Sequence, residues 1–431
     1  MHTNGHGRRS PGSGELRYGL DTEPAVGKRR ITITRRRAYG DGGIDPRGEN
    51  SWRLRYRING KRFTKTVRGT KTEAQKALRD LLHSGDTGTH VAPDKITVGQ
   101  WVEQWIASGA PGRRQKKVGR RTIERYSELL RCHAVPTLGP RRLQQLQASE
   151  VDALYVDLAA KLKPRTAHHV HTVLSACLGT AVRKGLVTVS PMARVEKVPS
   201  PGESDHGAVL DAEELRKLME GFRGSVLYPI VAMAAFTGAR RNEILALRWS
   251  DLDTANKTLR IERALEETKE GLTFKAPKTK RGVRTIAIDD GLIALLLVER
   301  EKHLRLIAGV PDGADVDLSL VRLPDGSLIF PSPAGAEFDF TKPRDPHAVT
   351  RGFVGRARKL GFAQLRFHDL RGSHETALLD RGVPVHVVAA RCGHDPAVLL
   401  RNYAKRTKKA DTSAAAVIGA LSQSILGGRK T

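Results

Sequence analysis

The chain has few cysteines, few acidic residues, few aromatic residues and no long apolar run. Its only three cysteines, Cys132, Cys177 and Cys392, are odd in number and far apart, which offers no zinc spacing and indicates a reduced compartment. No stretch approaches the roughly 18 apolar residues of a membrane span, and the N-terminal arginines accompany no apolar signal core, so we expect a cytoplasmic protein without membrane contact. Aromatic residues form 5% of the chain and no stacking motif, which disfavours RNA binding.

The shortage of acidic residues leaves a large excess of positive charge. The 431 residues include 74 Lys and Arg against 46 Asp and Glu, so the net charge is +28, and the isoelectric point is near 10.4. A polyanion held through phosphate contacts is the expected partner, and nucleic acid suits this charge better than a membrane does. The length predicts two or three domains.

The N-terminal region changes character near residue 48. Residues 1–47 are rich in glycine, arginine and serine and predict a basic flexible arm, which either keeps the chain soluble or follows a phosphate backbone. Beyond it, apolar residues alternate with arginines, and Asn59-Gly60 predicts a tight turn between two strands. Thr70 with Glu73 then forms a capping pair that starts a helix.

One face of this predicted sheet is cationic. Trp52 and Leu54 belong to the apolar face, and the arginines between them belong to the other. Residues 48–92 are therefore predicted to be a DNA-binding domain whose sheet lies in a major groove, the alternative being a merely solvated face. The residues expected to contact DNA are Arg53, Arg55, Arg57, Arg62 and Lys65.

Apolar residues at helical spacing predict an all-helical domain over residues 96–195, with helices near 98–106, 122–134, 149–162 and 164–184. His168 and His171 have a spacing that would permit a shared metal, but no cysteine or carboxylate completes the set, so we favour surface histidines. A basic run is expected to clamp a DNA backbone. Its cations are Arg113, Arg114, Lys116, Lys117, Arg120 and Arg121.

A linker over residues 196–208, rich in proline, glycine and serine, separates the helical domain from a long C-terminal domain over residues 209–409. Asp211 is its expected first helix N-cap. The tail over residues 410–431 has apolar residues at helical spacing and predicts one more helix.

Four residues near the end of the C-terminal domain have spacings that would bring them together. His368 and Arg371 are three residues apart and should lie on one side of a helix, facing one phosphate. After a proline-containing break, a second helix should end at Gly393, and His394 follows it. A third helix then brings Tyr403 back toward the same point.

Two upstream segments add cations to this group. Arg240 follows a segment that looks buried, residues 231–236, and stands beside Glu243, whose carboxylate can hold it rigid. Two alternating stretches, residues 257–263 and 285–288, are predicted strands and flank the sequence KAPKTKRGVRT. Lys278 and Lys280 should therefore lie on a mobile hairpin between strands, from which a lysine can swing onto a phosphate.

Together these motifs resemble the tyrosine recombinase family, also called the phage integrase family. The resemblance is closest over residues 209–407. It implies a multidomain fold, mainly α with small β-sheets. The expected parts are an N-terminal arm-binding domain with a three-stranded sheet plus helix, a helical core-binding domain, and a mixed α+β catalytic domain.

The resemblance implies a site-specific DNA recombinase, most readily an integrase of a phage, prophage or integrative element, that needs neither metal nor ATP. Tyr403 would attack the scissile phosphodiester and form a 3′-phosphotyrosyl link. Arg240 and Arg371 would stabilise the pentavalent transition state. His368 would act as the base, and His394 would donate a hydrogen bond to the phosphate.

The leaving 5′-oxygen would be protonated by Lys278, which matches the family's lysine best, with Lys280 as the alternative. The chain departs from the family at Cys392, where leucine is usual, and at Ala239, where leucine or methionine is usual. Neither change removes a catalytic group. We interpret Cys392 as a packing residue, the alternative being an oxidisable thiol.

The implied partner is double-stranded DNA at attachment sites, bound by a tetramer near the nucleoid, without a cofactor. A DNA-bending host factor and an excision factor are further expected partners, and the tail helix would pack on a neighbouring protomer or on its own domain. Three alternatives stay open: a resolvase or invertase of the same chemistry, a topoisomerase that reseals its own strand, and a DNA-binding regulator that does not cut.

Overall fold

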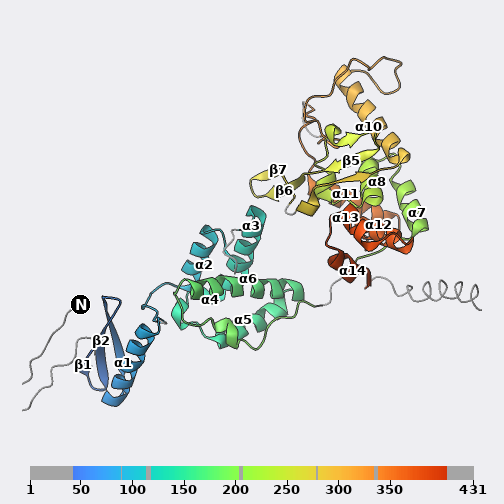
Figure 1. The fold of residues 1–431 in the computed structure, drawn as a ribbon. Coiled ribbons are helices and arrows are strands. Elements are labelled where there is room, and N and C mark those ends of the chain that lie inside the picture. The colour runs from blue at the N-terminus through green and yellow to red at the C-terminus, as the bar shows by residue number, and fades with distance from the viewer. Residues whose placement is uncertain are drawn as a thin grey trace, which may run out of the picture. The chain divides into compact units, whose positions relative to one another are not determined.

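The computed structural model describes residues 42–88, 90–112, 118–202, 207–277, 280–333 and 338–404, with side chains up to residue 401 apart from that of residue 280. The chain divides after Ala92 into two compact units (Figure 1). Helices predominate and the sheets are small and antiparallel. Across the described ranges, no helix combines the length and the apolar character needed to cross a membrane.

The first unit is a three-stranded antiparallel sheet covered by one helix. The strands β1 (Gly43–Gly48), β2 (Ser51–Ile58) and β3 (Lys61–Arg68) pair in that order, and α1 (Lys71–Asp86) follows. In the core of this unit Leu54 and Tyr56 of the sheet pack with Ala74 and Leu78 of the helix. These apolar contacts hold the helix on one face of the sheet and leave the other face to solvent.

The predicted helix cap and hairpin turn of this unit are confirmed, but the unit begins earlier in the chain than predicted. Thr70 caps α1, with its hydroxyl accepting from the backbone N of Glu73 at 3.3 Å and its own N donating to the Glu73 carboxylate at 2.7 Å. Asn59 and Gly60 both have positive φ, as a tight hairpin turn requires. Strand β1 begins at Gly43, within the segment that the composition assigned to the flexible arm. The sequence did not predict this strand, because its glycines and proline obscure the alternation of apolar and polar residues that marks a strand.

The second unit starts with helices packed around Trp101, Trp105 and Tyr155. A π-helical segment, Leu130–Ala134, joins α3 to α4, where the sequence predicted one continuous helix. The other helices lie close to their predicted positions. The helices of this part are α2 (Val98–Ala107), α3 (Arg120–Leu129), α4 (Val135–Leu138), α5 (Ala148–Lys161) and α6 (Pro164–Arg183).

The rest of the second unit mixes helices with two small sheets. Asp211 caps the first helix as predicted, accepting from the backbone N of Glu214 at 2.8 Å. The helices are α7 (Ala212–Phe222), α8 (Tyr228–Thr237), α9 (Arg241–Ile244), α10 (Asp290–Ala308), α11 (Pro346–Lys359), α12 (Asp369–Asp380), α13 (Val385–Cys392) and α14 (Pro396–Ala404). The strands are β4 (Leu252–Asp253), β5 (Thr258–Ile261), β6 (Ala264–Thr268), β7 (Gly271–Lys275) and β8 (Arg284–Ala287).

Sheet topology corrects one prediction about the lysine segment. Strand β5 pairs directly with β8, in the order β4-β5-β8, and a separate hairpin of β6 and β7 lies between them in the chain. The predicted lysine segment therefore connects β7 to β8, rather than β5 to β8. Lys278 lies outside the described residues.

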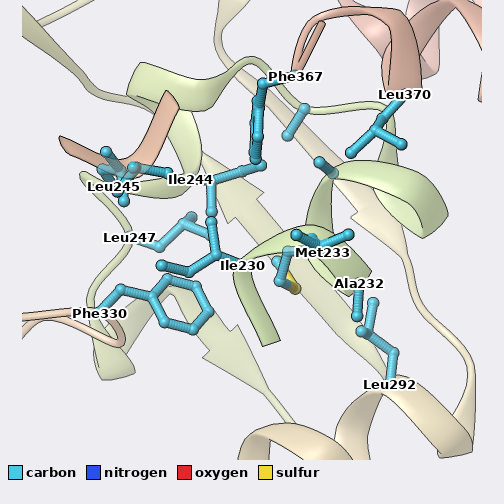
Figure 2. Close-up of a cluster of buried hydrophobic side chains, with 14 of the residues drawn as sticks. Ile230, Ala232, Met233, Ile244, Leu245, Leu247, Leu292, Phe330, Phe367 and Leu370 are labelled. Carbon is cyan, nitrogen blue, oxygen red and sulfur yellow. The ribbon is translucent and has the colours of Figure 1, made fainter. Parts of the chain in front are cut away.

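Helix α8 lies at the centre of the C-terminal core. Figure 2 shows Ile230 and Met233 of α8 in one cluster with Phe330, Phe367 and Leu370, the last from α12. All residues from Pro229 to Ala235 are buried, but Phe236, which the sequence placed in the buried segment, is 43% exposed. Because α8 and α12 share this core, the turn after α8 and the first turn of α12 are held close together.

Candidate active site

Arg371 is the most deeply buried charge of the site. Its side chain is 2% exposed, on the first turns of α12. One terminal nitrogen, Nη1, donates to the carbonyl of Gly238 at 2.6 Å, and the other, Nη2, donates to the carbonyl of Cys392 at 2.5 Å. Burial lowers the pKa of this guanidinium, with the nearby charge of Arg240 acting in the same direction. Arg371 thus joins the turn after α8 to the end of α13.

Arg240 lies beside it on that turn, and its side chain is 39% exposed. Its backbone N donates to Oε2 of Glu243 at 2.9 Å and its Nη1 to Oε1 at 2.8 Å, so the predicted carboxylate contact is confirmed. Its Nη2 donates to the carbonyl of Gly393 at 3.3 Å. The arrangement fixes one side of the guanidinium and leaves another side open to solvent, as a phosphate-binding arginine requires.

Glu243 accepts from a further arginine that the sequence analysis did not single out. Nη2 of Arg284 lies 2.8 Å from its Oε2. Burial by itself raises the pKa of the Glu243 carboxyl, but hydrogen bonds and charge from Arg284 and Arg240 outweigh burial, so its pKa lies below the usual value. The carboxylate therefore stays ionised inside the protein.

His394 follows the end of α13. Gly393 has φ of +66° and ends the helix in the left-handed conformation, as predicted from the sequence. Nε2 of His394 lies 3.2 Å from Nε of Arg371 and 2.8 Å from Oε1 of Glu375. The same carboxylate oxygen lies 3.0 Å from Nε of Arg371. Arg371, His394 and Glu375 therefore meet at one point.

His368 is the N-cap of α12, which corrects the prediction that it lies within the helix. Its carbonyl still accepts from the backbone N of Arg371 at 3.2 Å, so the two residues keep neighbouring positions. The residue as a whole is exposed to solvent. Surrounding protein and the charge of Arg371 lower the pKa of its imidazole. A neutral imidazole is the form that accepts a proton.

The remaining catalytic candidates are placed less completely. Tyr403 lies in the last turn of α14, at residues 396–404, as the spacing predicted for its backbone. Lys278, like the whole tail from residue 410, lies outside the described residues. Cys392 is fully buried at the end of α13, and burial raises its pKa to about 11, so the thiol is held in its neutral form.

The sequence missed Glu375 and Arg284. Glu375 is four residues after Arg371 on α12, a spacing that signals an ion pair on one helix face. Nothing in the sequence shows that His394, on a different segment, reaches the same carboxylate. Arg284 gave no comparable local signal, because its partner Glu243 precedes it by 41 residues.

The predicted DNA-contacting residues of the first unit are divided between two faces of its sheet. In register Arg53, Arg55 and Arg57 of β2 stand opposite Thr66, Thr64 and Arg62 of β3, so the four arginines share the face turned away from the core. Lys65 pairs with Leu54 and lies on the other face. Arg55 is not free, because its Nε lies 2.8 Å from the carboxylate of Asp45.

In the basic run of the helical part, only two of the six predicted cations are described. Arg120 and Arg121 begin α3; Arg120 is ion-paired with Glu270, and Nη1 of Arg121 lies 3.9 Å from Glu124. Residues 113–117 lie outside the described ranges.

The histidines of α6 take protein partners. Nδ1 of His168 contacts the carbonyl of Pro199 at 2.7 Å, and Nδ1 of His171 contacts the hydroxyl of Tyr155 at 2.9 Å. Among the side chains that the structure describes, no cluster of three or more His, Cys, Asp or Glu residues could hold a metal ion.

The sequence is similar to integrases and tyrosine recombinases. The sequence profile of the phage integrase family matches residues 208–410. An integrase of Streptomyces ambofaciens is 27% identical over 385 residues, which cover 84% of this chain and 91% of that protein. A XerC-like tyrosine recombinase of Caldanaerobacter subterraneus is 25% identical, over 78% of this chain and 86% of that protein.

A solved structure has the same fold. The Tn1549 transposon integrase, determined in complex with a circular intermediate DNA, superposes with a TM-score of 0.58 at 18% identity, over 76% of this chain and 99% of that chain. The predicted multidomain fold, mainly α with small sheets, is thereby confirmed. Residues 208–410 are a phage integrase family domain, and the chain is a site-specific DNA recombinase.

Proposed function

We propose that this recombinase is an integrase of a phage, prophage or integrative element that cuts DNA through a covalent 3′-phosphotyrosine at Tyr403. The observation that carries the proposal is the convergence of Arg371, Arg240 and His394 around the Gly393 turn, from three separate segments of the chain. Two guanidinium groups and an imidazole side by side suit one phosphate group better than any apolar ligand.

In the proposed reaction the tyrosine hydroxyl attacks the scissile phosphorus, and the bond to the 5′-oxygen breaks. His368 accepts the tyrosine proton, and Lys278 donates a proton to the departing 5′-oxygen. Arg240 and Arg371 bind the non-bridging oxygens, on which negative charge increases in the pentavalent transition state. The phosphotyrosyl bond conserves the energy of the original diester, so rejoining needs no ATP, and the two arginines supply the charge stabilisation that a metal would otherwise supply.

We also propose double-stranded DNA at attachment sites as the substrate, bound by a tetramer of the chain within the cytoplasm. The arginine face of the first unit and the basic start of α3 support contacts with the DNA backbone outside the cut site. A DNA-bending host factor and an excision factor are further predicted partners.

Covalent capture in cells tests this function. Wild-type protein and the Tyr403→Phe variant are expressed, denatured and captured, and the attached DNA is sequenced. Adducts at a discrete site with the wild type, and none with the variant, are expected. Junctions that join two different DNA molecules distinguish an integrase from a resolvase or invertase. Scattered adducts would instead indicate a topoisomerase, and their complete absence would indicate a regulator that does not cut.

A further inference from the structure

Arg284 is a buried arginine next to the proposed phosphate site that the reaction described above does not use. It begins β8, and its side chain is 6% exposed. Its two terminal nitrogens, Nη2 and Nη1, lie 2.8 Å and 3.3 Å from the two carboxylate oxygens of Glu243. Its Nε donates to the carbonyl of Arg391 at 2.8 Å. One side chain therefore connects β8, the Arg240 turn and the end of α13.

Two arginines share the Glu243 carboxylate, and they differ in exposure. Arg240 is 39% exposed, while Arg284 is almost fully buried. Both terminal nitrogens of Arg284 face the Glu243 carboxylate, so of these two arginines Arg240 is the one left to meet a phosphate of bound DNA. The three side chains carry two positive charges and one negative charge, which leaves one positive charge in excess, and the accessible part of that charge is on Arg240.

Arg284 affects the net charge around Glu243 more than it affects the position of Arg240. Glu243 already fixes Arg240 through two hydrogen bonds, one from the backbone and one from the guanidinium. Without Arg284, the pair of Glu243 and Arg240 would have no net charge. A carboxylate that is 4% exposed is little screened by water, so it would oppose an incoming phosphate.

We propose that Arg284 is a positioning residue for DNA cleavage, which neutralises Glu243 and so leaves the charge of Arg240 available to the scissile phosphate. By holding the carbonyl of Arg391, three residues before His394, it also keeps the Arg240 turn and the His394 turn together. This inference rests on the proposed function and adds a residue to its site.

The test compares cleavage of two DNA duplexes that carry the site recovered by covalent capture. One has the natural scissile phosphodiester, and the other has a methylphosphonate there, in which a methyl group replaces one charged non-bridging oxygen. The variants are Arg284→Met, the double variant Arg284→Met/Glu243→Gln, and a control, Arg263→Met. Arg263 pairs with Asp251 in another enclosed ion pair, 17% and 4% exposed against 6% and 4% for Arg284 and Glu243, and it is not part of the site.

We expect Arg284→Met to slow adduct formation on the phosphodiester by about 100-fold, and on the methylphosphonate by about tenfold or less, because less charge must be stabilised there. The double variant removes the uncompensated carboxylate and should recover about tenfold of the lost rate. Arg263→Met should have the same small effect on both duplexes. Thermal melting of each variant gives the folded fraction to which the rates are normalised.

Equal rate losses of Arg284→Met on the two duplexes would overturn the inference, because a merely structural role predicts that result. A double variant no faster than Arg284→Met would overturn it as well. The wild-type control tests the proposed function separately: wild type that forms no adduct overturns that function and this inference with it. Active wild type beside an unimpaired Arg284→Met overturns the inference alone.

Discussion

At the scale of single residues, the site depends on guanidinium groups whose nitrogens have separate tasks. Arg371 uses one N–H on each terminal nitrogen for a backbone carbonyl, at Gly238 and at Cys392, and each of these nitrogens carries a second N–H. The side chain is therefore anchored to the protein and can still donate toward a phosphate. An ammonium group at the same place cannot span two carbonyls that face different nitrogens.

The variant Arg371→Lys tests this division of tasks. We expect adduct formation to fall by about 100-fold or more, since the transition state loses a fixed bidentate donor. Binding to the same duplex, measured by a gel shift on the Tyr403→Phe background, should fall much less. Loss of binding as large as the loss of cleavage would contradict a role in the transition state.

Glu243 should make the free energy of unfolding fall as the pH becomes acidic. Its folded pKa lies below the usual value of 4.5, so its contribution to stability is present above about pH 4.5 and is lost as the pH falls through the folded pKa. Glu243→Gln should lower the free energy of unfolding at pH 7 by about 3 kcal/mol, because the buried Arg284 and the partly exposed Arg240 lose their shared partner. Protonated Glu243 resembles glutamine, so the difference from wild type should shrink toward pH 3.

Denaturant unfolding followed by circular dichroism at pH 7, 5 and 3.5 measures this difference. Glu213→Gln is the matched control, because Glu213 pairs with Arg216 at the surface, where an ion pair contributes little. A difference between wild type and Glu243→Gln that stays constant or grows on acidification would show that the carboxylate is not stabilised by its arginines.

At the scale of elements, the ends of helices place the site. The turn after α8 carries Arg240, the start of α12 carries His368, and the end of α13 carries His394. Gly393 is confined there: a Cβ added to it would lie 3.0 Å from the carbonyl of Arg281 and 3.1 Å from Nη1 of Arg284. The left-handed turn at Gly393 and its tight surroundings both favour glycine.

Gly393→Ala should therefore destabilise the protein by about 1 kcal/mol and also reduce adduct formation, because it disturbs the carbonyl that Arg240 contacts. Gly309→Ala is the control. Gly309 ends α10 with the same φ of +66°, and an added Cβ would meet nothing within 4 Å. Both variants should lose stability, measured by denaturant unfolding, with the larger loss for Gly393→Ala because of its close neighbours. After cleavage rates are normalised to the folded fraction, only Gly393→Ala should lose cleavage. Equal cleavage by the two variants would contradict a role for the Gly393 turn.

Elements with a strong local signal could be predicted from the sequence. The cap residues Thr70 and Asp211 and the terminal Gly393 act through contacts within a few residues, so their spacing identifies helix ends. Strand β1 could not be predicted in this way, because it is defined only by pairing with β2. The placement of His368 at the helix boundary depends on backbone geometry that the three-residue spacing does not specify.

In the site, too, contacts between residues near in sequence could be predicted and contacts between distant segments could not. Arg240 and Glu243 are near in sequence, and their contact was predicted. Glu375 was missed because the fold, rather than the spacing, brings His394 to it from the turn after α13. Contacts between distant segments depend on the packing of α8 with α12 in the common core, which no single segment specifies.

At the scale of the whole molecule, the net charge of +28 implies that DNA binding depends strongly on salt. The first unit has its own core around Leu54 and Leu78 and carries seven basic residues and no acidic one between Ser51 and Thr70. Deleting residues 1–92 should therefore leave the second unit folded. The truncated protein should still form an adduct at the cut site, since the residues of the site all belong to the second unit.

What the deletion should change is the salt dependence of binding. The slope of log Kd against log salt becomes shallower by about 0.9 for each phosphate contact that is lost. The slopes are measured by fluorescence anisotropy on a long duplex that includes DNA flanking the cut site, and on a short duplex with the cut site alone. We expect a shallower slope for the truncated protein on the long duplex and equal slopes for both proteins on the short one. Equal slopes on the long duplex would mean that the arginine face of the first unit is merely solvated, whereas a change on the short duplex would place that unit at the cut site itself.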